Sequence, residues 1–304
     1  MSKTQLSLPV ALGWIVASML VFSGGGYALC KRYYSPSIAS APFSVISALV
    51  QTGPQKEVLK TEYLAELLHL SNDSPCRVDT FNLTKAQEAL LASPLISKAE
   101  VKLIKPHTLY VDYTARQPLA WLEDYPNVVI DKEGVPFPFT PFFAPKNLPA
   151  LYLGLAPFGE APEETYKPLV KWHKPLQGKA VDLAFTILNC LTDLAVCDQF
   201  VVKRIDLSSA FAESYGMREI VITTEDSFTL RLCNKDVQCI IPRFLRLSTK
   251  NYAQELGNYL KLREVLLAEE QKTLSLLEPS APIVRLKEKI LDFRLQQLAF
   301  IQNP

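Results

Sequence analysis

The sequence is poor in the residues and motifs from which catalytic and metal sites are built. It holds 11 glycines, few for a loop that wraps a nucleotide phosphate, and neither a G-x-S-x-G turn nor an H-E-x-x-H helix occurs. Its 3 histidines are scattered, and no C-x-x-C motif accompanies them. A zinc site would need such ligands at short, regular spacings. We therefore predict no catalytic residues, no cofactor and no metal site.

An excess of charge of either sign is also missing. The chain carries 32 basic and 31 acidic residues, which gives a formal net charge of +1. Nucleic-acid-binding surfaces usually show a basic excess, so this balance gives no support to a nucleic-acid partner. Hydrophobic residues make up 48% of the 304 positions, which is enough for a folded core. At roughly 150 residues per domain, the length allows two ordinary domains.

Charge is absent altogether between Leu6 and Leu29, where apolar residues dominate. As a helix this stretch would be about 36 Å long, and the hydrocarbon core of a bilayer is ~30 Å thick. We predict a transmembrane helix at 6–29, preceded by a cytoplasmic tail at 1–5. A cleaved signal peptide is the alternative, with Lys3 as its charged start and Ser23-Gly24-Gly25 as its small-residue exit.

Only one membrane span is predicted, because no later stretch reaches ~18 uninterrupted apolar residues. Its orientation does not follow from local charge. Lys3 precedes the predicted helix, and Lys31 and Arg32 follow it. The positive-inside rule therefore does not favour an external C-terminus.

Five elements are predicted between residues 43 and 117. Residues 30–42 mix Ser, Pro, Ala and Tyr without periodicity and are interpreted as a linker. After it, alternating or β-branched runs predict strands, and helical spacing of apolar residues predicts helices. In chain order they are a strand at 43–50, helices at 60–70 and 84–92, and strands at 99–103 and 109–113. This order predicts a small α+β domain with helices on one face of its sheet.

A second α+β domain is predicted from 118 to 304. Helical spacing predicts a helix over 179–200 and a longer one over 243–271. Between them, apolar runs separated by turn residues such as Glu225-Asp226-Ser227 predict consecutive strands, which we expect to form an antiparallel sheet. These strands are expected at 201–207, 217–224, 228–233 and 237–241, after shorter ones at 127–131 and 151–154.

Two smaller features of the second domain leave alternatives open. Cys233 and Cys239 flank a predicted turn, and they either form a disulfide or remain free buried thiols. The prolines and phenylalanines of 136–145 predict an extended segment. We expect its aromatic rings to pack on the second sheet, and the alternative is an exposed aromatic patch for a partner.

One run of the chain resembles a known family. Residues 94–121 read P-L-I-S-K-A-E-V-K-L-I-K-P-H-T-L-Y-V-D-Y-T-A-R-Q-P-L-A-W. This run is similar to the end of the POTRA domain in the FtsQ/DivIB family of bacterial cell-division proteins, although Ala115 stands where the family often has Glu. Residues 129–137 resemble the family motif hydrophobic-hydrophobic-D-x-x-G-x-x-F, and residues 148–154 resemble its L-P-x-L-x-G motif. The resemblance implies that 43–117 form a POTRA-like domain.

The resemblance also bears on the C-terminus, where the family has a D-L-R strand. Asp292-Phe293-Arg294 is the only candidate here. The surrounding residues 285–297 are rich in good helix formers, so a helix is the alternative. A strand would lie at the edge of the second sheet, where an incoming strand can pair. In the family FtsB docks in this region together with FtsL, so the resemblance assigns Arg294, Leu295 and Gln297 to a partner-binding surface.

Arg116 and two nearby carboxylates have more than one interpretation. Arg116, the signature arginine, is either a partner contact or a structural hydrogen-bond donor at the domain junction. Asp131 and Glu133 have the chemistry of an acid–base pair. A solvated turn before Gly134 is the preferred explanation of both carboxylates.

The resemblance implies a non-enzymatic scaffold of the division machinery. Such a protein would bind single-span division proteins like FtsB and FtsL and help control septal peptidoglycan synthesis. Its place would be the bacterial inner membrane, with the C-terminal domain in the periplasm at the division septum. Two other functions are kept as alternatives: a POTRA-containing factor in outer-membrane protein assembly or secretion, and an anchored periplasmic enzyme of unrecognised type.

Overall fold

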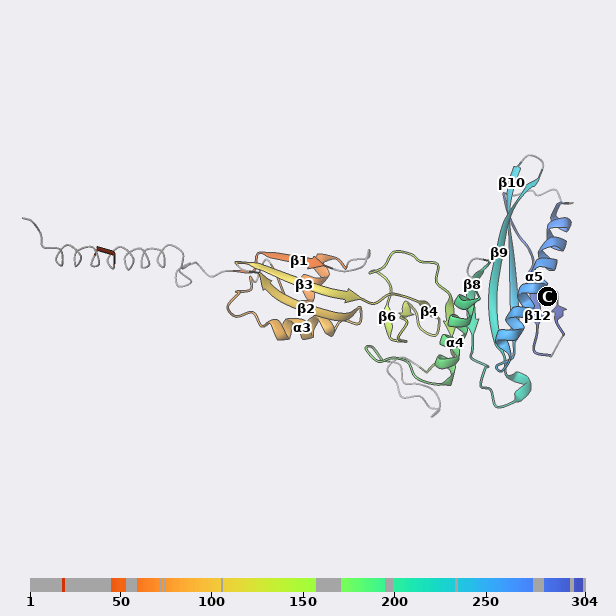
Figure 1. The fold of residues 1–304 in the computed structure, drawn as a ribbon, viewed down its shortest axis with the longest axis horizontal. Coiled ribbons are helices and arrows are strands. Elements are labelled where there is room, and N and C mark those ends of the chain that lie inside the picture. The colour runs from red at the N-terminus through yellow and green to blue at the C-terminus, as the bar shows by residue number, and fades with distance from the viewer. Residues whose placement is uncertain are drawn as a thin grey trace, which may run out of the picture.

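In the part of the chain that the structure describes, the strands form two sheets, one of three strands and one of ten. Figure 1 shows the smaller sheet, with β1, β2 and β3, beside the larger one. The fold is that of a computed structural model, which describes residues 18–19, 45–52, 59–71, 73, 75–104, 106–156, 171–194, 199–232, 235–275, 282–295 and 298–302. Within these ranges the chain has thirteen strands and four α-helices.

The predicted fold class is wrong in two respects. Across the described ranges, no helix has both the length and the apolar composition needed to cross a bilayer. The predicted tail at 1–5, the linker at 30–42 and all but two residues of 6–29 lie outside the described residues. The second correction concerns the larger sheet, which is mixed and not antiparallel, because four of its strand pairs run parallel.

The smaller sheet has the strand order β1-β3-β2. Strand β1 (Ala48–Thr52) runs parallel to β3 (Thr108–Ala115), and β2 (Ile96–Ile104) pairs antiparallel with β3 as a hairpin. A parallel pair needs a crossover connection. Helices α2 (Thr61–Leu67) and α3 (Leu83–Leu91) supply it. The order of elements over 48–115 is therefore the order expected from the sequence.

One face of the smaller sheet is covered by α2 and α3. Leu64 of α2 and Leu90 of α3 are fully buried against Leu109 and Val111 of β3. The start of α3 is held by Asn82, whose side-chain oxygen accepts a hydrogen bond from the backbone N–H of Lys85. Such a cap satisfies one of the free N–H groups at the first turn of a helix.

The larger sheet has the order β13-β12-β10-β9-β8-β7-β4-β5-β6, with β11 also paired to β10. Its strands are β4 (Ala120–Leu122), β5 (Val128–Ile130), β6 (Pro136–Pro138), β7 (Ala150–Tyr152), β8 (Val201–Asp206), β9 (Ile220–Leu232), β10 (Lys235–Leu247), β11 (Ile283–Arg285), β12 (Lys289–Asp292) and β13 (Phe300–Gln302). Helices α4 (Lys179–Asp193) and α5 (Tyr252–Ser275) both contribute to the main hydrophobic cluster on this sheet.

Two boundaries in the larger sheet differ from the sequence prediction, and one buried charge explains both. The strands expected at 217–224 and 228–233 form the single strand β9, so 225–227 is not a turn. The helix expected from residue 243 begins at Tyr252, because 243–247 complete β10. Asp226 lies inside β9 and pairs with Arg243 of β10, and their side chains are 2% and 0% exposed.

This buried pair is part of a larger ion network. Arg243 also donates to Glu270 of α5 at 2.6 Å, and Lys289 of β12 donates to the same carboxylate at 2.8 Å. Arg263 of α5 donates to Asp226 at 2.7 Å. Buried charges need such partners, because isolated ones are strongly unfavourable in a low-dielectric interior. The network therefore ties α5 and β12 to the centre of the sheet.

The two sheets meet at a junction that is shared by both hydrophobic cores. Every residue of β5 is buried: Val128 and Ile130 belong to the core of the larger sheet, and Val129 belongs to the core of the smaller one. Phe137 and Phe139 are buried in the core of the smaller sheet as well. Side chains of a strand alternate between its two faces, so one short strand serves two cores.

The proline-rich aromatic segment packs on the larger sheet, as expected from the sequence, and it also reaches the core of the smaller sheet, which was not expected. The ring centres of Trp121 and Phe139 are 4.6 Å apart, and those of Phe142 and Tyr63 of α2 are 5.0 Å apart. We call Trp121, Phe137, Phe139 and Phe143 the aromatic junction. Its rings pack on the face of β4–β6 that is turned to the smaller sheet and join the two, and they do not form an exposed patch.

Candidate partner-binding site

The sequence left open whether residues 285–297 form a strand or a helix, and they contain strands. β12 ends at Asp292, and the following Phe293 is 4% exposed in the main core. Arg294 and Leu295 come directly after Phe293. Figure 1 shows β12 close to the marked C-terminal end of the chain. Gln297, the third residue assigned to a partner surface, lies outside the described residues.

Arg294 is held in place by a set of ion pairs. Its guanidinium donates to the Asp292 carboxylate at 2.7 Å and lies 3.1 Å from Glu219, and it also donates to the Gly216 carbonyl at 3.3 Å. Arg246 also pairs with Glu219, at 2.6 Å, and with Asp292, at 3.5 Å. The Arg294 side chain is 24% exposed, so its position is set by neighbours while part of it faces solvent.

These contacts change the acidity of Asp292. Burial raises the pKa of this carboxyl, but hydrogen bonds from the Arg294 side chain and backbone, with the charges of Arg294 and Arg246, outweigh it. The net pKa lies below the ordinary value of 3.8. The hydrogen bond with Asp292 in turn raises the pKa of Arg294. Both groups are therefore charged at neutral pH.

A groove with a volume of about 520 Å³ lies beside Arg294. Its walls come from a short 3-10 turn (Tyr215–Met217), from the loop between β10 and α5, and from the chain after β12. The loop is fixed because Ser248 donates from its backbone N–H and its hydroxyl to Glu255, each at 2.6 Å. The lining residues are Tyr215, Gly216, Arg218, Ser248, Thr249, Lys250, Asn251, Asp292, Arg294, Leu295 and Phe300.

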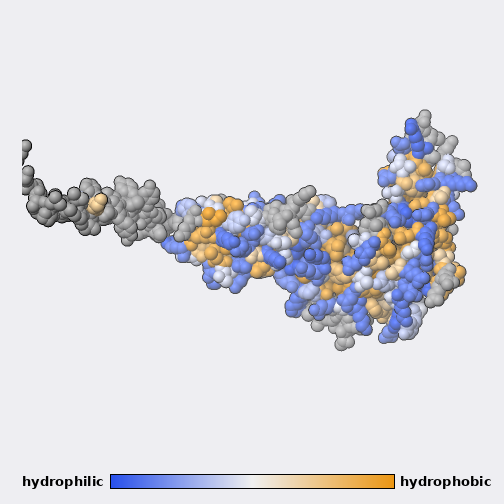
Figure 2. Space-filling view, in the orientation of Figure 1, coloured by the Kyte–Doolittle hydropathy of each residue, from blue (hydrophilic) through white to orange (hydrophobic). Residues whose placement is uncertain are grey.

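Exposed apolar side chains gather around this groove. Tyr215 is 76% exposed and lies under the Arg218 guanidinium, 4.1 Å from its carbon to the ring centre. Leu295 and Phe300 also line the groove and are exposed, and Met217 of the adjoining 3-10 turn is exposed as well. On the face seen in Figure 2, hydrophilic and apolar residues are interspersed. Clustered exposed apolar groups are typical of protein contacts.

The end of the larger sheet is formed by β13. It pairs antiparallel with β12 through Phe300, Ile301 and Gln302, and all three residues are exposed. An edge strand offers unpaired N–H and C=O groups to an incoming strand. We call β12, β13 and the residues between them the C-terminal edge. Sequence analysis missed Tyr215 and Phe300, and the apolar Phe300-Ile301 pair near the terminus was the available signal.

Arg116 lies away from the groove, at the junction of the two sheets. Its guanidinium donates to Asp131 at 2.6 Å, and the two side chains are 10% and 7% exposed. Asp131 also accepts backbone N–H bonds from Glu133 and Val135, each at 2.9 Å. Arg116 is thus a structural hydrogen-bond donor at the domain junction, one of its two interpretations. The turn was expected to be solvated, and this is wrong for Asp131, which is buried, while Glu133 is exposed.

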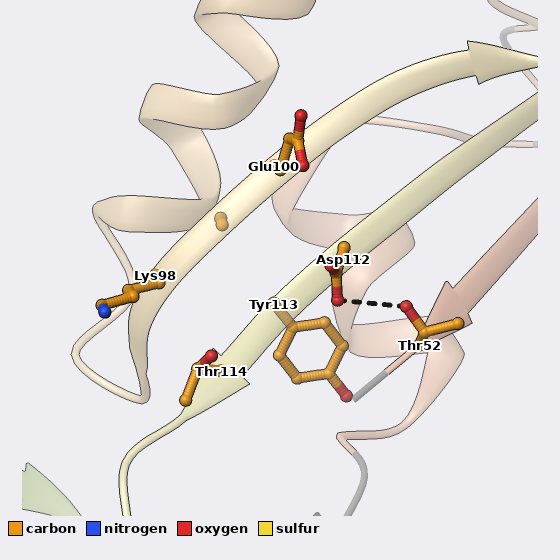
Figure 3. A pocket seen from close by; sticks show the side chains of 7 residues that line it. Thr52, Lys98, Glu100, Asp112, Tyr113 and Thr114 are labelled. Atoms are coloured by element: carbon orange, nitrogen blue, oxygen red, sulfur yellow. Dashed lines mark hydrogen bonds between the residues drawn. The ribbon is translucent and has the colours of Figure 1, made fainter. Parts of the chain in front are cut away.

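A second hollow, of about 500 Å³, lies on the smaller sheet (Figure 3). Asp112 points toward Thr52 and accepts its hydroxyl hydrogen bond at 3.0 Å. Glu100 is paired with Lys102 at 2.8 Å, and the Tyr113 hydroxyl accepts the backbone N–H of Leu59 at 2.8 Å. Asp112, Glu100 and Tyr113 of this hollow are thus each engaged by a neighbouring group of the small domain, as is usual on a sheet surface.

In the described ranges, the candidate metal ligands are the His, Cys, Asp and Glu side chains, and the cysteines are also the candidate disulfide partners. No group of three His, Cys, Asp or Glu side chains there is arranged to hold a metal ion. Cys76, Cys190 and Cys239 are free thiols. Burial raises the pKa of Cys239. Cys233, which the sequence placed opposite Cys239 as a possible disulfide partner, lies outside the described residues.

No family model matches this chain, and no curated protein is significantly similar to it. The resemblance to the FtsQ/DivIB family therefore rests on the motifs at 94–121, 129–137 and 148–154, and it stays a prediction.

Proposed function

We propose that this protein is a non-enzymatic scaffold of the bacterial division machinery. It binds FtsB-like and FtsL-like division proteins and helps control septal peptidoglycan synthesis. The single observation that supports this most is the C-terminal edge, where a short edge strand lies beside a groove rimmed by exposed apolar side chains. The family resemblance assigns Arg294 and Leu295, which lie at this edge, to a partner-binding surface.

The proposed mechanism is recognition by strand addition. Backbone groups of an added strand pair with the sheet edge and supply affinity, while pockets for side chains supply specificity. Here the groove beside Arg294 receives side chains of the partner, and Leu295 and Tyr215 provide apolar contact area. Arg294 is fixed by Asp292 and Glu219, so it presents a positioned guanidinium without first losing side-chain entropy.

The proposed location is the extracytoplasmic side of the inner membrane at the division septum. A fluorescent fusion of the full chain tests it: enrichment at the septum is expected, and a uniform distribution over the cell contradicts the proposal. Depletion of the protein is expected to leave cells that elongate without dividing.

Partner capture by the full chain is the direct test of the proposed site. We expect the external segments of FtsB-like and FtsL-like proteins of the same organism to be retained by the full chain. Leu295→Asp is expected to weaken retention by at least about tenfold, or about 1.4 kcal/mol. Val265→Asp on α5 is the matched control, because Leu295 and Val265 are both 56% exposed.

A charge reversal tests the groove separately. Arg294→Glu places a third carboxylate beside Asp292 and Glu219, so it should abolish capture while the protein stays folded. If neither groove variant affects capture, the partner binds at another surface of the protein. No capture by the unaltered chain, together with normal septation after depletion, would refute the proposed function.

A further inference from the structure

The last strand of the chain occupies the position that an added strand would take on β12. β12 is anchored on one side by its backbone pairing with β10 and by side-chain burial. Leu291 is fully buried, the following Phe293 is 4% exposed, and the N–H of Phe293 donates to the Arg246 carbonyl of β10 at 2.9 Å. β13, in contrast, is paired with β12 over three residues only. The sheet thus ends in a well-anchored strand covered by a weakly held one.

None of the β13 side chains contributes to a buried cluster. Phe300 and Ile301 are 49% and 45% exposed, and Gln302 is exposed as well. Little apolar area is therefore lost from contact when β13 leaves the sheet, and local opening is easiest where buried contacts are fewest. Leu298, in the connection before β13, is 58% exposed.

We propose that β13 is an internal competitor for the partner's strand, and that binding proceeds by exchange of β13 for the partner segment on β12. This inference rests on the proposed function, since it specifies how the same C-terminal edge is regulated. Phe300 connects the two parts of the site, because it belongs to β13 and also lines the groove. Release of β13 therefore frees the edge of β12 and widens the groove in one step.

The register of β13 indicates which segment would replace it. Residues directly opposite each other on paired strands project to the same face. Ile301 is opposite Leu291, whose side chain is in the core, and Phe300 is opposite Asp292 at the groove. The partner segment is thus extended and antiparallel to β12, with an aromatic side chain for the groove and, next to it, an aliphatic one for the core face.

Two variants with opposite expected effects test the exchange, and the probe is the external segment of the FtsB-like protein of the same organism. Deletion of residues 299–304 removes the competitor, so the dissociation constant should fall by at least about fivefold, because more molecules are competent to bind. The double variant Ile290→Cys with Gln302→Cys joins two directly paired residues. The Cα atoms of directly opposite residues on antiparallel strands are about 4.5 to 5.5 Å apart, a separation that a disulfide can bridge. Oxidation should lock β13 and suppress capture, and reduction should restore it.

The unaltered chain under the same oxidising and reducing conditions is the control for its own cysteines. If the deletion weakens capture, or if the locked form binds as well as the reduced one, the partner adds to β13 itself and the exchange is refuted while the proposed function stands. If no variant binds the probe, both proposals fall. Should the deletion variant not fold, the reversible lock decides the question alone.

Discussion

Two strands of equal length lie in opposite environments in this molecule. β5 and β13 each have three residues, yet every residue of β5 is buried and every residue of β13 is exposed. β5 contributes to both hydrophobic cores, whereas β13 contributes to neither. The comparison shows that hydrogen bonding in a sheet does not decide how firmly a strand is held. Side-chain burial does, because it supplies most of the favourable free energy.

The same contrast holds for the two arginines that accompany these strands. Arg116 pairs with Asp131 beside β5, where both side chains are nearly buried. Arg294 pairs with Asp292 next to the C-terminal edge and is 24% exposed. The first pair fixes one sheet against the other, and the second holds a side chain in position at a surface. We therefore expect substitutions at the junction to affect stability and those at the edge to affect binding.

The largest expected effect comes from matched charge insertions in the two strands. Val129→Asp places an unpaired carboxylate in a fully buried position, so it should lower the free energy of unfolding by roughly 4 kcal/mol or more. Ile301→Asp, at a 45% exposed position, should lower it by less than about 1 kcal/mol. Urea denaturation of both variants measures the difference. Equal losses of unfolding free energy in the two variants would contradict the expected difference between β5 and β13.

A smaller effect is expected from truncating the two arginines. Arg116→Ala leaves Asp131 buried without its cation, which should lower the free energy of unfolding by about 3 kcal/mol. Arg294→Ala should lower it by about 1 kcal/mol or less, because its pair is partly solvated. Adding Asp131→Asn to Arg116→Ala should recover part of the loss, since the amide oxygen still accepts the N–H groups of Glu133 and Val135. No recovery would argue against charge as the cause.

The smallest expected effect is a pH dependence at the C-terminal edge. The pKa of Asp292 is lowered in the folded protein, so its contribution to stability is present above the ordinary value of 3.8 and is lost as the pH falls through the folded pKa. Unaltered protein should therefore lose more stability on acidification than Asp292→Asn does. Denaturation midpoints of both proteins at neutral pH and between about pH 5 and pH 2 provide the measurement. Parallel curves would contradict the assignment.

Several elements follow from local pattern alone. The β2–β3 hairpin has alternating apolar positions, and Val101, Leu109 and Val111 of this pattern are buried as period two requires. The apolar face of α4 is buried at Val181, Ala184 and Ile187, as helical spacing predicts, although the helix ends at Asp193 and not at 200. Such elements are predictable because neighbours in sequence carry the signal.

The site was only partly predictable. Position along the chain and the family resemblance pointed to Arg294 and Leu295, but Tyr215 and the loop at 248–251 reach the groove from elsewhere in the sequence. The groove exists because β12 lies next to β10, which brings the end of β10 and the turn before β9 to one place. A pattern of neighbouring residues in the sequence cannot predict that these distant segments lie close together.

By itself, the sequence determined the order of strands and helices over 48–115. For the elements that follow, it determined which segments are apolar enough to pack in a core. Tertiary structure decided three other points. Asp226 lies within a strand because Arg243 and Arg263 neutralise it in the interior. Residues 289–292 lie in a run, 285–297, that is rich in helix formers. They form a strand because β10 and β13 offer backbone partners on both sides and the core takes Leu291. β5 is buried on both faces because two sheets meet there. In each case the favourable interactions that decide the structure are made with residues distant in sequence. They outweigh the helix or strand propensity of the segment itself.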